Sequence, residues 1–145
     1  MKWLYKNLYR DKEGFTLVEL MIVIIILAIL TGIAVPSYMV LRDRARIAAA
    51  QSELKNIATA LEMYYADNNE TYPATTFAAM TTALESGGPG GEAYMNNVPD
   101  TDGWTNPYVY TAPDPSGGLY LLESYGPDGV TGGGDDIQII DGELQ

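Results

Sequence analysis

Acidic residues in two parts of this chain could do chemistry: three aspartates in a glycine-rich run and one glutamate in an apolar run. In the run from Ser124 to Ile137, Asp128, Asp135 and Asp136 are hard oxygen donors, and the interspersed glycines let backbone carbonyls turn inward. Calcium takes about six to eight such oxygens in adaptable geometry. The spacing does not match an EF-hand loop, so a solvated acidic loop is the alternative interpretation of the same residues.

Histidine and cysteine are both absent from the 145 residues. Their absence removes the usual general base, the usual zinc ligands and any disulfide. No serine or carboxylate lies in a recognisable pairing of nucleophile and base. The glycines between Ser86 and Gly91 are not followed by the lysine that a phosphate-binding loop needs. We therefore expect neither an enzyme nor an organic cofactor.

The acid of the apolar run is Glu19, within the stretch from Gly14 to Val35. A helix over this stretch would span about 30 Å, the thickness of a bilayer's hydrocarbon core. A carboxylate at mid-bilayer costs roughly 2.5–3.5 kcal/mol, although a place near the helix N-terminus softens this penalty. Because intramembrane acids are commonly functional, Glu19 indicates more than an anchor; an acid tolerated near the interface is the alternative.

The segment before Gly14 contains four basic and two acidic residues, a net charge of +2. Positive charge ahead of the first apolar span holds that side in the cytoplasm, so we expect the rest of the chain on the far side. A secretory signal would have a shorter apolar core, followed by small residues at a cleavage site. Here the small residue, Gly14, precedes the apolar run.

The residues from Gly14 to Glu19 read G-F-T-L-V-E, which resembles the processing signature of type IV pilins and of the pseudopilins of type II secretion. The resemblance implies that a prepilin peptidase cuts between Gly14 and Phe15, and that Phe15 is N-methylated. It also implies that Glu19 meets the new N-terminal ammonium of a neighbouring subunit while a filament assembles. Phe15 and Glu19, four residues apart, share one helix face.

The apolar run ends at Pro36, which cannot donate a hydrogen bond to the carbonyl of Gly32. We expect the helix to be weakest around Gly32 and Pro36, as a simple kink or, as the resemblance implies, as a region that bends or melts in a filament. Apolar residues at spacings of three and four predict that the helix continues from Ser37 to about Ala66.

After the helix, the pattern predicts a short second helix from Thr76 to Leu84. It also predicts strands around Tyr108–Tyr110 and Leu119–Tyr125, joined by a turn over residues 114–118. Val98-Pro99 and the W-T-N-P-Y element from Trp104 resemble the major pseudopilin family. The resemblance implies an α+β, pilin-like fold with a long N-terminal helix on a small antiparallel sheet.

Four segments follow from these patterns: a leader over 1–14, a membrane or filament-core helix over 15–36, its amphipathic continuation over 37–66 and a head over 67–145. The resemblance also implies that the glycine-rich loop binds structural calcium. By matching position, Asp128 and Asp136 would be ligands, with Asp135 as a further one. The glycine segment is shorter than that family's usual one.

Removing the leader changes the net charge from −11 to −13, and no basic residue follows Lys55. So acidic a surface argues against nucleic acid as a partner. The resemblance implies a homo-oligomeric pseudopilus anchored in the bacterial inner membrane, with the head in the periplasm and minor pseudopilins and an inner-membrane assembly platform as partners. The alternative is a type IV pilus subunit serving adhesion, motility, DNA uptake or conduction; the missing cysteines and the acidic loop argue against it.

Overall fold

The computed structural model describes residues 14–113 and 119–145, and its first element is a helix of 51 residues, α2 (Leu17–Asp67). The helix runs without a break through Gly32 and Pro36. Pro36 lacks an amide hydrogen, while the Ser37 hydroxyl donates to the Ile33 carbonyl at 3.0 Å. The long helix predicted from the sequence is confirmed, and melting around Pro36 in a filament stays a prediction.

The first half of α2 is apolar enough to cross a membrane, with a mean hydropathy of 2.9 in its most apolar window, none of which is buried. Its large side chains are exposed, from Leu17 to Val35. Exposed apolar surface of this extent needs lipid or another protein to cover it. By contrast, Leu54, Ile57 and Leu61 in the second half are fully buried.

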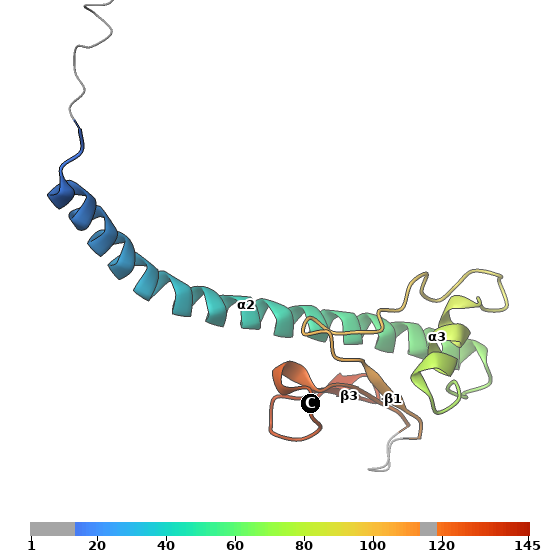
Figure 1. The fold of residues 1–145 in the computed structure, drawn as a ribbon. Helices are drawn as coiled ribbons and strands as arrows, with labels where there is room; N and C mark the ends of the chain where they lie inside the picture. The colour runs from blue at the N-terminus through green and yellow to red at the C-terminus, as the bar shows by residue number, and fades with distance from the viewer. Residues whose placement is uncertain (1–13, 114–118) are drawn as a thin grey trace, which may run out of the picture. The chain divides into compact units, whose positions relative to one another are not determined.

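The described structure divides into two compact units between Val40 and Leu41. The second unit contains the rest of α2, the short helix α3 (Phe77–Glu85) and a four-stranded antiparallel sheet in the order β1-β2-β3-β4 (Figure 1). The strands are β1 (Val109–Thr111), β2 (Leu121–Ser124), β3 (Ile137–Ile140) and β4 (Glu143–Leu144), and a short 3₁₀ turn, η1 (Gly126–Asp128), follows β2.

The helix ends where asparagine permits the chain to turn. Asn69 and Glu70 both have positive φ, and the amide of Glu70 donates to the Tyr65 carbonyl at 3.1 Å. Thr76 then caps α3 by accepting from the amide of Ala79. Both helices therefore end and begin close to where the sequence predicts.

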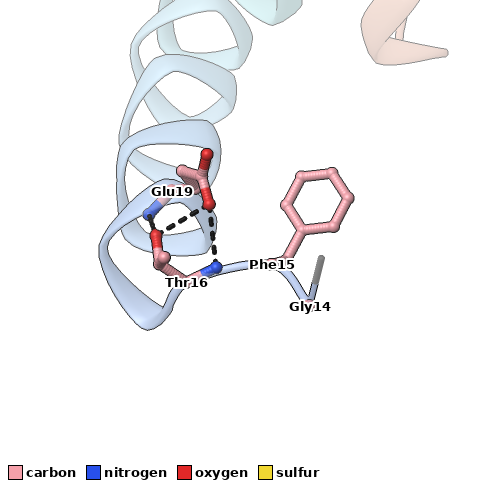
Figure 2. Close-up of a pocket in the computed structure, with 4 residues that line it drawn as sticks. All are labelled: Gly14, Phe15, Thr16 and Glu19. Carbon is pink, nitrogen blue, oxygen red and sulfur yellow. Dashed lines mark hydrogen bonds between the residues drawn. The ribbon is translucent and has the colours of Figure 1, made fainter. Parts of the chain in front are cut away.

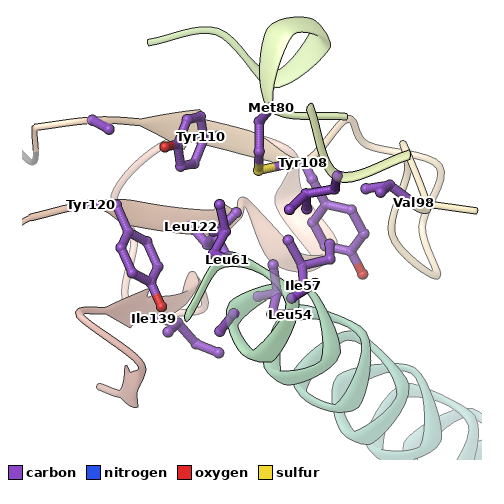
Figure 3. Packing of buried hydrophobic residues seen from close by; sticks show 14 of the residues in the cluster. Leu54, Ile57, Leu61, Met80, Val98, Tyr108, Tyr110, Tyr120, Leu122 and Ile139 are labelled. Atoms are coloured by element: carbon purple, nitrogen blue, oxygen red, sulfur yellow. The ribbon is translucent and has the colours of Figure 1, made fainter. Parts of the chain in front are cut away.

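The core lies between α2, α3 and the sheet. Tyr110, Leu122 and Ile139 are paired across β1, β2 and β3, so their side chains fall on one face of the sheet. All three are buried, and Figure 3 shows them gathered around Leu61. Because the helix supplies one wall of this core, the head of residues 67–145 depends on the second half of α2 for its folding.

The sequence patterns predict only two of the four strands. The predicted strands around Tyr108–Tyr110 and Leu119–Tyr125 correspond to β1 and β2, whereas Ile137 is predicted at the end of a loop. Instead, Ile137 begins β3, and the Asp141-Gly142 turn leads into β4. An Asp-Gly pair between apolar residues is a hairpin signal that could have revealed both strands. The turn predicted at 114–118 lies outside the described residues.

Candidate functional site

The side chains of Thr16 and Glu19 cap the N-terminus of α2. Thr16 precedes the first helical residue, and its hydroxyl accepts from the amide of Glu19 at 3.2 Å. In return, Glu19 Oε2 accepts from the Thr16 amide at 2.8 Å and from the Thr16 hydroxyl at 2.7 Å (Figure 2). This is a capping box, in which two free donors of the first turn are satisfied reciprocally.

The capping box places the Glu19 carboxylate next to the predicted cleavage point. Phe15 is 84% exposed and lies before the helix begins, together with Gly14. Phe15, Gly14, Thr16 and Glu19 line one shallow pocket, in which a Cβ added at Gly14 would meet nothing within 4 Å. The peptide bond between Gly14 and Phe15 is therefore accessible, and the carboxylate lies close to where cleavage would create an ammonium.

The sequence patterns indicate Glu19 as a partner for another subunit or as an acid tolerated near the interface, and neither interpretation includes this role within the chain. The signal was present, because Thr-x-x-Glu ahead of an apolar run is a capping-box pattern. Both hydrogen bonds from Thr16 go to Oε2, and none of the described residues bonds to Oε1. That second oxygen can accept a further donor.

Of the three aspartates in the acidic loop, two have carboxylates that face the same point. A Cβ added at Gly133 would lie 3.0 Å from Asp135 Oδ1 and 3.1 Å from Asp128 Oδ2, so these two carboxylates face the same point. Asp136 Oδ2 accepts from the Gly132 amide at 2.7 Å, whereas Asp136 Oδ1 is buried and has no hydrogen-bond partner among the described residues. Within 14–113 and 119–145, no three acidic, histidine or cysteine side chains form a metal-binding group.

The buried carboxylate of Asp102, which no sequence pattern indicates, is linked to the start of this loop by hydrogen bonds. Asp102 is 6% exposed, and its Oδ1 accepts from the amides of Trp104 and Asn106, both at 2.9 Å. Its Oδ2 accepts from the buried hydroxyl of Ser124 at 2.7 Å. The Asn106 side chain then donates to the Gly126 carbonyl at 2.7 Å. This Asp102 network joins the W-T-N-P-Y element to β2 and to the start of the acidic loop.

Tyrosines pack the sheet against the helices. Tyr72 contacts Tyr65 and Tyr120, with ring centroids 4.5 and 4.9 Å apart. The Tyr108 hydroxyl donates to Glu53 Oε2 at 2.6 Å; burial, followed by this carboxylate, raises the pKa of Tyr108 above its ordinary value. The tyrosines therefore have a structural role in the head.

Two family models match the chain. The model of type II secretion system protein G covers residues 37–142, and the prokaryotic N-terminal methylation motif covers residues 9–35. The second match includes Gly14, Phe15 and Glu19. Together, the two models extend over nearly the whole chain.

Curated relatives agree with this match. The type II secretion system core protein G of Pseudomonas aeruginosa is 39% identical over 132 residues, which cover 87% of this chain and 91% of the relative. The Escherichia coli K12 protein of the same name is 37% identical, covering 88% and 90%. The crystal structure of the major pseudopilin from the type 2 secretion system of enterohaemorrhagic Escherichia coli superposes with a TM-score of 0.53 at 29% identity, covering 69% of this chain and 90% of the other.

These matches support the pseudopilus subunit over the surface pilus that remained as an alternative. They also agree with the α+β, pilin-like fold, a long helix with a small antiparallel sheet, and with a structural protein that is no enzyme. The chain belongs to the type II secretion system protein G family, the major pseudopilins, whose members are structural subunits of a pseudopilus.

Proposed function

We propose that the chain is cut between Gly14 and Phe15, is N-methylated on Phe15, and then polymerises from the inner membrane into a periplasmic filament that supports export of folded proteins. The observation that supports this proposal is the site in Figure 2. There an accessible Gly14–Phe15 bond lies next to Glu19, in the capping box at the N-terminus of an exposed apolar helix. The basic leader supports retention of the N-terminus in the cytoplasm, with the head in the periplasm.

Filament assembly uses Glu19 Oε1, the carboxylate oxygen that Thr16 does not bind. Within one chain, the carboxylate is held at Oε2 by Thr16, which fixes its orientation. The Phe15 ammonium of a neighbouring subunit binds at Oε1 and neutralises a charge that would otherwise be costly among apolar helices. Minor pseudopilins and an assembly platform in the inner membrane act as further partners, and the acidic head leaves nucleic acid without a binding surface.

A deletion strain tests this function. Loss of the gene is expected to abolish secretion of folded proteins into the medium, and the wild-type copy is expected to restore it. Mass spectrometry of the purified protein should find an N-terminal methylated Phe15. Normal secretion in the deletion strain, together with long surface fibres that vanish with the gene, would favour the type IV pilus instead.

We also propose that the acidic loop binds a structural calcium ion, which would draw its three aspartates together, since they do not form a metal-binding group in the described residues. Asp128 and Asp135 present carboxylate oxygens to one point, and Asp136 Oδ1 is a buried acceptor that needs a donor or a cation. Backbone carbonyls of the loop would complete an oxygen-only shell, which suits calcium better than softer metals. These three residues would hold the ion, and the ion would tie β2 to β3.

Removing calcium is expected to lower the melting temperature of the protein. EDTA should shift the transition by several degrees, because a ligand that binds only the folded state stabilises it by mass action, and added calcium should restore it. Differential scanning fluorimetry in detergent measures the shift. Asp128→Ala should lose the response to calcium, whereas Asp100→Ala, a change at an exposed acid outside the loop, should keep it. An unchanged transition in EDTA would exclude structural calcium.

A further inference from the structure

The charges of the processed chain are segregated along its length. Its four basic residues, Arg42, Arg44, Arg46 and Lys55, all lie on α2, and every charged residue after Lys55 is acidic. Copies with a net charge of −13 repel one another when they are brought together. Any ion pair that links the head of one copy to a basic side chain of another must therefore use one of these four residues.

Arg44 is the base best placed to reach another copy. The stem of Arg46 lies against Gly103, since a Cβ added there would come within 3.1 Å of Arg46 Cγ. Arg42 lies 3.9 Å from Asp43. Arg44 and Lys55 are both exposed and make no ion pair with any of the residues that the structure describes. Lys55 lines an acidic groove of its own chain, which leaves Arg44 as the base available to another copy.

A groove with acidic side chains lies between α2 and the β3–β4 hairpin, and we call it the hairpin groove. Lys55 and Glu62 line it from the helix, and Gly142, Glu143 and Leu144 line it from the hairpin. Across the described part of the chain, no ion pair joins Lys55 to either carboxylate. Two carboxylates and one ammonium leave the groove with a negative charge.

A buried hydroxyl lies behind the residues that line this groove. Tyr120 is fully buried, and its hydroxyl has no hydrogen-bond partner within 14–113 and 119–145. A Cβ added at Gly142 would lie 3.8 Å from this hydroxyl and 3.9 Å from Glu62 Oε1, so both oxygens lie beside the groove. Figure 3 shows the Tyr120 hydroxyl on the side of the core where Ile139 of the hairpin lies. Glu62 Oε1 already accepts from the Tyr72 hydroxyl at 2.9 Å, so Glu62 Oε2 and the Tyr120 hydroxyl are the oxygens left for a further donor.

We propose that the hairpin groove binds the guanidinium of Arg44 from a second copy of this chain, between Glu62 and Glu143 and near the Tyr120 hydroxyl. The two sites cannot meet within one chain, because Arg44 and Glu62 are separated by 18 positions of α2, about 27 Å along its axis. Copies shifted along the helix direction by about this distance bring them together. The contact rests on the proposed filament, and it gives the otherwise acidic head a basic partner.

Cross-linking tests the contact without removing the charges. The chain has no cysteine, so two introduced thiols report only on their own separation. Ala48→Cys lies one turn beyond Arg44, and Thr59→Cys lies one turn before Glu62 at the hairpin groove. In full-length protein assembled in the native host, a short bis-maleimide should give a ladder of linked copies when both cysteines are present. Ala48→Cys combined with Ala78→Cys, on the exposed face of α3, should not.

Charge exchange supplies the second measurement. Arg44→Glu and Glu143→Arg should each reduce the assembled fraction several-fold, and the double variant should recover it, whereas Glu92→Arg, an exposed acid outside the groove, should assemble normally. Thermal melting of each variant shows that the head is folded. Normal assembly of both single variants, or filaments that give no ladder with the Thr59 cysteine, would overturn the contact and leave the proposed function intact. Absence of filaments from the wild-type chain would instead overturn the proposed function.

Discussion

Glu19→Ala is expected to abolish filament assembly while cleavage of the leader continues. The substitution leaves the ammonium of a neighbouring Phe15 unpaired in an apolar surrounding, and breaking a buried pair in this way costs about 3–5 kcal/mol. A loss of that size weakens each subunit contact more than about a hundredfold. Electron microscopy of sheared or overexpressed filaments, with mass spectrometry of the processed N-terminus, measures both parts of the prediction.

Thr16→Ala is the matched control, because the capping box gives Glu19 two roles that must be separated. This variant loses the threonine hydroxyl but keeps the carboxylate, so it should weaken the helix end by about 0.5–2 kcal/mol and still assemble. If Thr16→Ala fails as completely as Glu19→Ala, helix capping explains the defect. Normal filaments from Glu19→Ala would remove the pairing mechanism.

Asp102→Ala is expected to destabilise the head more than other changes of a single acid. It would leave two backbone amides and the Ser124 hydroxyl without their acceptor in a buried place. Each buried donor left without its acceptor costs about 1–3 kcal/mol, so losing the acceptor of all three costs about 3 kcal/mol or more. For a unit of this size, such a loss lowers the melting temperature by more than about 10 °C, measured by circular dichroism.

Two variants calibrate the Asp102 result. Asp102→Asn keeps the shape and one carbonyl oxygen, so it should lose much less stability than the alanine. Asp100→Ala removes an exposed acid two residues away and should change the melting temperature little. Because Asn106 joins the Asp102 network to Gly126, Asp102→Ala should also weaken the response to calcium. A melting temperature like that of the wild type would show that the network does not stabilise the head.

Much of the fold follows from local patterns in the sequence. The apolar run around Glu19 and the three-and-four spacing beyond Ser37 fix a long helix, and that helix is present from Leu17 to Asp67. Thr76 and the apolar face after it fix α3 in the same way. Helices depend on contacts between near neighbours, so a sequence read in order contains most of their determinants.

The sheet was harder to predict, because its pairing joins residues far apart in the chain. β3 and β4 were not predicted, because Ile137, the first residue of β3, was assigned to the end of the acidic loop. The Asp141-Gly142 pair, which indicates a hairpin, was nevertheless visible in the sequence. The register that aligns Tyr110, Leu122 and Ile139 against the helix emerges only when all three strands are placed. Cross-strand contacts of this kind are not encoded in spacing along one strand.

The sequence by itself determined the processing signature, the apolar helix, the position of Glu19 and the segregation of every base to residues before the head. Tertiary structure alone decided that Asp102 is buried under the acidic loop, and that Glu62 and Glu143 face one groove beside Tyr120. The physical reason is the range of the interactions. Charge and hydropathy are properties of single residues and short runs, whereas burial and hydrogen-bond partners depend on segments that only folding brings together.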